Sequence, residues 1–192
     1  MKVVIIEALG DADLKKFRNL GHRTEAYLKG LGLDVTYYRA TNESELIAVM
    51  PKCGLANVVH LICHANDSVI ELPDGSRIAW DDLRNVIGDH FRDKRLFLAA
   101  CKAGTRTAPS RLLFQGGHVQ EVVGPFLNVT ADASLLAAQS YYPGIIKGDT
   151  SDNIAAAMNS GQAKQYRIYT RTGISSYKML PEPAPRAKVK RK

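Results

Sequence analysis

Short apolar runs alternate with amphipathic stretches through the first hundred residues. The runs at 3–6, 58–63 and 95–100 are almost continuous, which is typical of strands covered on both faces, and 35–38 has similar character. Between them, apolar residues recur at helical spacing, and each stretch opens on a capping residue: Asp11 or Asp13, Asn42 with Glu45 three positions later, and Asp81 or Asp82. Strands that alternate with helices predict an α/β fold whose sheet is mostly parallel, with right-handed crossovers.

The remaining segments complete this pattern less regularly. Residues 68–72 and 77–79 flank a Pro-Asp-Gly-Ser turn and predict a small hairpin. The first helix is expected to run from Asp11 or Asp13 to the glycines at 30 and 32. In the second half we expect helices at 109–114, from Asp132 to Tyr142 and at 154–158, and strands at 121–124 and 166–169. Asp132 is expected to cap its helix, and Pro143 to end or kink it.

Two residues with nucleophilic and basic chemistry follow two of the predicted strands. His64 comes directly after 58–63, and Cys101 directly after 95–100. Side chains beyond the carboxyl ends of neighbouring parallel strands share one crevice. A thiolate is a nucleophile, and an imidazole can take its proton and later protonate a leaving amine. The spacing therefore allows a cysteine hydrolase, while a buried structural cysteine and a surface histidine remain the alternative.

Metal and cofactor chemistry are not expected. Cys63 and His64 are adjacent, so in a strand they point to opposite faces, and the chain holds no CxxC pair. His60, which alternates with Ile62, should face the same side as His64, as a packed core histidine or as one that supports the site residues from behind. No phosphate-binding glycine loop is present. We therefore predict neither a metal nor a cofactor.

The sequence around the two candidate residues resembles the caspase-like cysteine peptidases, and within them the CHAT branch, the bacterial relatives of caspases and separase. The resemblance rests on HLICHAND at 60–67, VIELPDGSRI at 69–78, DDL at 81–83 and RLFLAACKAG at 95–104, and extends more weakly over residues 3–170. These families share an apolar strand ending in His-Gly, a hairpin with an Asp-Gly turn, and a strand ending in Ala-Cys with a glycine soon after. The resemblance implies a three-layer caspase-like sandwich over residues 1–178.

The same resemblance implies the site. Cys101 would attack the scissile carbonyl, and His64 would act as base or ion-pair partner and then as acid. The oxyanion would be held by the backbone N–H groups of Cys101 and of Ala65, which stands where most of the family has glycine. The family's specificity pocket would include Asn128, Thr130 and Asp132, and an acid there would select a basic P1 residue, unless Asp132 is a helix cap.

Composition and charge add three expectations. The 192 residues carry a net charge of +7, and the last twelve hold five basic residues, one acid and three prolines, so we expect residues 179–192 to be a disordered tail. Contact of that tail with nucleic acid is possible in principle but not favoured. Three cysteines without a secretory signal predict a cytoplasmic protein, and no apolar run is long enough for a membrane.

These observations favour a cysteine endopeptidase that acts on a protein substrate and is triggered by a partner chain or a dimer. Two alternatives remain. The chain would be a catalytically silent caspase-like interaction module, or a flavodoxin-like domain in which His64 and Cys101 are packing residues. Reactivity separates them, because a catalytic cysteine is partly exposed and has a low pKa.

Overall fold

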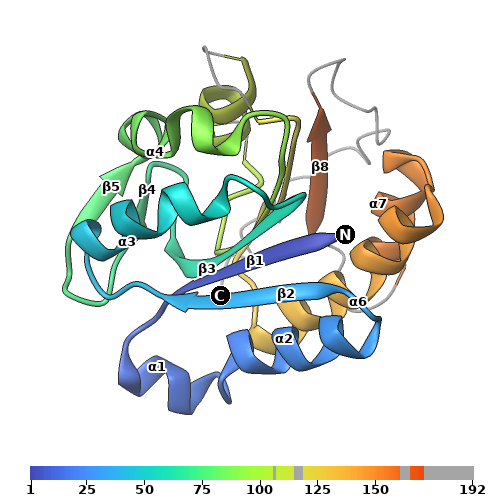
Figure 1. Cartoon of the computed structure of the whole chain (residues 1–192), viewed down its shortest axis with the longest axis horizontal. Helices are drawn as coiled ribbons and strands as arrows, with labels where there is room; N and C mark the ends of the chain where they lie inside the picture. Colours follow the sequence, from blue (N-terminus) through green and yellow to red (C-terminus); the bar gives the residue numbers. More distant parts are fainter. Residues whose placement is uncertain (106, 115–118, 161–164, 171–192) are drawn as a thin grey trace, which may run out of the picture.

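A central sheet of mostly parallel strands organises the structure, a computed structural model that describes residues 1–105, 107–114, 119–160 and 165–170 (Figure 1). The strand order is β2-β1-β3-β6-β7-β8, and only β8 on this path is antiparallel to its neighbour. A hairpin of β4 and β5 extends from the end of β3. The bounds are β1 Lys2–Ala8, β2 Asp34–Arg39, β3 Val58–Ala65, β4 Val69–Glu71, β5 Arg77–Ala79, β6 Arg95–Ala99, β7 Glu121–Pro125 and β8 Tyr166–Thr170.

Helices cover both faces of this sheet and make three layers. The helical segments are α1 Asp11–Lys16, α2 Leu20–Gly30, α3 Glu43–Val49, η1 Met50–Cys53, α4 Trp80–Ile87, η2 Gly88–Phe91, α5 Thr107–Pro109, η3 Ser110–Phe114, α6 Ala131–Lys147 and α7 Ser151–Asn159. One buried apolar cluster joins the sheet to α3 and α4, and a second joins the opposite face to α2, α6 and α7. The predicted α/β architecture with a mostly parallel sheet is therefore confirmed. No helix within the described part of the chain is long and apolar enough to cross a membrane.

Alternation along β3 distributes its side chains between the two clusters. Leu61 and Cys63 belong to the cluster beneath α3 and α4, whereas Ile62 belongs to the other. His60 faces the Ile62 side, as predicted: its ring stacks on Phe97 with centroids 4.4 Å apart and bonds the Tyr142 hydroxyl at 3.0 Å. Burial lowers the pKa of His60 to about 3, so this side chain is a neutral core residue.

The predicted first helix is in fact two helices. Arg18 and Asn19 both have a φ of +53°, in the left-handed region, and they separate α1 from α2. The buried carboxylate of Glu7 on β1 accepts the Gly21 N–H at 2.9 Å, one of the donors that the first turn of α2 leaves unpaired. This long-range contact supports a helix start that the hydrophobic pattern alone does not reveal.

The caps expected for three helices are wrong. Neither Asp11 nor Asp13 caps α1, whose N-cap is Gly10; both aspartates lie in its first turn. Asp132 does not cap α6: the cap is Thr130, whose hydroxyl accepts the Ala133 N–H at 3.1 Å. Pro143 does not end α6, which continues to Lys147. The carbonyl that loses its partner to the proline, that of Gln139, instead accepts the Tyr27 hydroxyl at 3.2 Å.

In the third case, helix α4 begins after Ala79, so Asp81 and Asp82 lie in its first turn instead of capping it. There they still oppose the positive end of the helix dipole. The predicted tail, 179–192, lies outside the described residues.

Candidate active site

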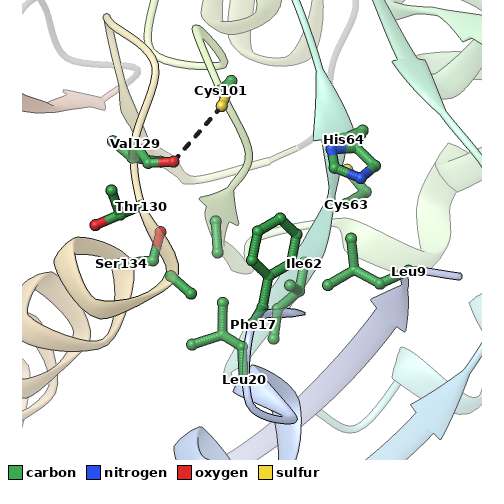
Figure 2. A pocket seen from close by; sticks show the side chains of 12 residues that line it. Leu9, Phe17, Leu20, Ile62, Cys63, His64, Cys101, Val129, Thr130 and Ser134 are labelled. Atoms are coloured by element: carbon green, nitrogen blue, oxygen red, sulfur yellow. Dashed lines mark hydrogen bonds between the residues drawn. The ribbon is translucent and has the colours of Figure 1, made fainter. Parts of the chain in front are cut away.

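The structure brings His64 and Cys101 to one pocket. Strands β3 and β6 are parallel neighbours, with Ile62 opposite Ala99, so their carboxyl ends open on the same edge of the sheet. His64 is the penultimate residue of β3, and Cys101 follows β6 by two residues. Both line a pocket at this edge, on opposite sides of its mouth in the view of Figure 2. The juxtaposition predicted from the strand ends is therefore present.

A carboxylate that the sequence reasoning did not select holds the imidazole. His64 Nε2 lies 2.9 Å from Asp13 Oδ2, with the two side chains 45% and 29% exposed. The ring of Phe17 meets the imidazole edge-on, at 5.9 Å between centroids. A carboxylate can only accept, so Nε2 carries the hydrogen and the lone pair of the neutral ring stays on Nδ1. Asp13 could have been found from the strand order alone, because it follows β1, and β1 flanks β3 on the side opposite β6.

Cys101 is the accessible cysteine of the three. Its side chain is half-buried, and its Sγ lies 3.8 Å from the Val129 carbonyl oxygen, the contact dashed in Figure 2. Within the described residues, no hydrogen bond joins Cys101 to His64. Cys53 and Cys63 are buried, and burial raises the pKa of each thiol to about 12, so both stay protonated and inert.

The sheet sets the direction of one of the two backbone N–H groups expected to hold an oxyanion, that of Ala65. The Asn66 N–H donates to Val69 O at 3.0 Å, so alternation along the β3–β4 ladder turns the Ala65 N–H away from β4. The hairpin lies on the β1 side of β3, because the N–H of Asp74 at its tip donates to the Thr41 carbonyl just after β2. The Ala65 N–H therefore faces the β6 side, where Cys101 lies.

Neither group is already committed to the sheet. Strand β6 pairs with β3 only as far as Ala99 opposite Ile62, so the ladder offers the Ala65 N–H no acceptor. The Cys101 N–H has no hydrogen-bond partner among the described residues. Ala65 is also absent from the described non-glycine residues with positive φ, so alanine is not strained where most caspase-like sequences have glycine.

The loop after Cys101 is fixed by a close backbone approach. Lys102 has a φ of +57° and donates its N–H to Leu127 O at 3.1 Å, which turns the chain sharply after the cysteine. Gly104 then donates to Pro125 O at 2.6 Å, and a Cβ on it would lie 2.0 Å from the Gly124 oxygen. Only glycine fits at 104, which gives a physical reason for a glycine shortly after the cysteine.

The predicted pocket residues divide between the pocket and the surface. Thr130 lines the pocket, whereas Asn128 and Asp132 are exposed and are not among the lining residues. The Asp132 carboxylate is 66% exposed and pairs with Arg23 at 3.0 Å. The full lining is Leu9, Phe17, Leu20, Ile62, Cys63, His64, Ala99, Cys101, Val129, Thr130, Ala131 and Ser134. Among the described residues, no group of three His, Cys, Asp or Glu side chains is placed to hold a metal ion.

Comparison with known proteins identifies the fold. No protein-family model matches the sequence, and no curated protein matches it. Among solved structures, the Arg-specific cysteine proteinase gingipain R (RGPB) matches 90% of this chain and 46% of its own, with a TM-score of 0.51 and 11% sequence identity. The fold is caspase-like. The chain spans less than half the length of that proteinase, and the caspase-like architecture expected from the sequence motifs is confirmed at this level.

Proposed function

We propose that this caspase-like chain is a cysteine endopeptidase of the CHAT branch, which cleaves a protein substrate through His64 and Cys101. One observation carries the proposal: the two residues that the sequence motifs single out line the same pocket. The carboxylate of Asp13 supports it, because it fixes the tautomer and orientation of His64.

The proposed chemistry begins with proton transfer from Cys101 to His64. The S–H proton passes to Nδ1, which keeps its lone pair because Nε2 donates to Asp13. The thiolate sulfur then bonds to the scissile carbonyl carbon, and the carbonyl electron pair moves to oxygen. The N–H groups of Ala65 and Cys101 would hold that oxyanion.

Collapse of this intermediate breaks the C–N bond. The proton on Nδ1 passes to the leaving amine, and the acyl group stays on the Cys101 sulfur. A water molecule then attacks the thioester with Nδ1 as base, the carboxylic acid leaves, and the proton returns to sulfur. The imidazolium in each half-reaction is stabilised by the Asp13 carboxylate.

The thiol must turn before this transfer. Its Sγ faces the Val129 carbonyl and not His64. An S–H···O hydrogen bond with 3.8 Å between sulfur and oxygen is weak, so rotation of the thiol about the Cα–Cβ bond costs little free energy. Catalytic hydrogen bonds are commonly loose in unliganded sites and tighten when substrate binds. Activation by a partner chain or a dimer remains a prediction that fits this resting arrangement.

Covalent labelling tests the proposal. The folded protein is treated with a mixture of peptidyl acyloxymethyl ketones, and the modified cysteine is mapped by mass spectrometry. We expect labelling of Cys101 that depends on His64. The buried, inert thiols of Cys53 and Cys63 serve as internal comparators. The matched control for His64→Ala is His90→Ala, which removes an exposed histidine outside the pocket lining.

Two results would contradict the peptidase. Labelling of Cys101 that His64→Ala leaves unchanged would show that the imidazole does not activate the thiol. Labelling of Cys101 no faster than that of Cys53 would favour the catalytically silent interaction module.

A further inference from the structure

We infer that the pocket beside Cys101 accepts the P1 side chain, and that this side chain is neutral and aliphatic, such as that of leucine or methionine. The inference rests on the proposed endopeptidase and names its substrate class. Two observations support it: the residues that line the pocket are mostly apolar, and the two hydroxyls among them are hydrogen-bonded within the protein.

Most of the residues that line the pocket, apart from the two candidate catalytic residues, are apolar; the exceptions are Thr130 and Ser134. Leu9 and Phe17 come from the segment after β1, Leu20 begins α2, and Ile62 and Ala99 come from the sheet. Figure 2 shows Phe17, Leu20 and Ile62 together on the side opposite Cys101. A side chain that enters from the scissile carbonyl at Cys101 therefore meets hydrocarbon, and its own burial is the favourable interaction.

The two hydroxyls in the lining are each hydrogen-bonded within the protein, and neither carries a charge. Thr130 Oγ1 accepts the Ala133 N–H at 3.1 Å as the cap of α6, and Ser134 Oγ bonds the buried Tyr166 hydroxyl at 2.9 Å. No Asp, Glu, Lys or Arg lies among the lining residues that the structure describes. A charged P1 group in this pocket would lose its water without gaining a counter-charge, which is strongly unfavourable.

The nearby carboxylates do not change this result. Asp13 is bonded to His64, and Asp132 is paired with Arg23 outside the pocket. The matched proteinase is Arg-specific, whereas the described residues that line this pocket include no carboxylate for a guanidinium group. The shared fold therefore does not extend to a shared P1 preference.

Pocket size is adjustable at one position. Ala131 is the first residue of α6, is half-buried, and lines the pocket beside Thr130. A leucine here extends from a helix terminus toward the pocket and reduces the space for P1 without opening the core. Ala131→Leu is therefore expected to disfavour a large P1 side chain more than a small one.

The experiment uses acyloxymethyl ketones that share one peptide and differ only at P1: Leu, Met, Ala, Arg, Lys and Asp. Rates of Cys101 modification are measured by intact-protein mass spectrometry. We expect Leu and Met to react at least about tenfold faster than Arg, Lys and Asp, since a few methylene contacts supply discrimination of that order. Ala131→Leu should lower the Leu-to-Ala rate ratio by about tenfold, and Asp132→Asn should leave it unchanged. Thermal unfolding confirms that both variants fold.

Each other outcome is decisive. Fastest reaction with Arg, Lys or Asp, or equal rates for all six probes, would overturn the aliphatic pocket while the His64-dependent cysteine peptidase stands. A Leu-to-Ala ratio unchanged in folded Ala131→Leu would show that P1 binds elsewhere. No modification of Cys101 by any probe would refute the proposed function itself, and the inference with it.

Discussion

Replacement of Asp13 by asparagine tests the proposed role of that residue in orienting His64. The amide keeps the size of the side chain, but it removes the charge that stabilises an imidazolium, and its NH₂ group can donate to Nε2 and favour the wrong tautomer. We expect kcat for peptide cleavage to fall while KM changes little, because Asp13 contacts Nε2, whereas the proposed proton transfer occurs at Nδ1, and Asp13 is not among the described pocket-lining residues.

The expected loss of kcat follows from how exposed the Asp13 and His64 side chains are. Surface ion pairs contribute about 0.2–1 kcal/mol, and hydrogen bonds to charged groups about 1.5–3 kcal/mol. With side chains 45% and 29% exposed and a 2.9 Å contact, the pair lies between these limits, at about 1–1.5 kcal/mol. That corresponds to a fall in kcat of about 5- to 12-fold. His64→Ala, which removes the base itself, should cost about 10²–10⁴-fold.

The assay compares kcat and KM of Asp13→Asn with those of Asp11→Asn and Asp13→Glu. Asp11 lies on the same helix, bonds Arg39 and is 82% exposed, so its variant controls for lost charge. Asp13→Glu restores the carboxylate and should recover part of the rate. Equal falls in kcat for the Asp11 and Asp13 variants, or a fall that appears only in KM, would refute the orienting role.

Three further predictions concern stability and pH. Gly104→Ala places a methyl carbon 2.0 Å from the Gly124 backbone oxygen, so it should lower the free energy of unfolding by about 2–3 kcal/mol in urea titrations and slow Cys101 labelling. Gly30→Ala, at a position with open space around it, should be neutral or stabilising. Equal effects of the two substitutions would refute the close approach at Gly104. Between pH 6.5 and 3 the unfolded chain binds one more proton at His60 than the folded chain, so the free energy of unfolding should fall by about 2 kcal/mol from pH 7 to 5. The folded variant His60→Gln should lose this pH dependence. The same pH dependence in the variant would show that His60 is not its cause. Thr130→Ala should cost about 1 kcal/mol and Asp132→Asn under about 0.5 kcal/mol; the reverse order would make Asp132 the cap.

The parts of the fold that the sequence predicts well are those fixed by local chemistry. Continuous apolar runs identified β1, β3 and β6, and the turn after Leu72 identified the hairpin. The cap of α3 was also visible, because Asn42 accepts the Glu45 N–H at 2.9 Å. The placement of His64 and Cys101 in one pocket was predictable because the carboxyl ends of neighbouring parallel strands lie at the same edge of the sheet.

The features that were missed depend on contacts between distant segments. The break before α2 is stabilised by Glu7, 14 residues away, and the passage of α6 through Pro143 by the Tyr27 hydroxyl, 112 residues from the carbonyl that it satisfies. The Asp13–His64 contact spans 51 residues and requires knowledge that β1 flanks β3. Single-sequence periodicity contains none of these distances.

The most direct measurement is proteolysis of a complex peptide library, with cleaved bonds identified by mass spectrometry. Wild-type protein is compared with Cys101→Ser and His64→Ala under the same conditions, and folding of each variant is verified by thermal unfolding. We expect new peptide termini with the wild type and none above background with either variant. The same set of cleavages with folded Cys101→Ser, or an intact library with wild-type protein, would contradict a peptidase built on Cys101 and His64.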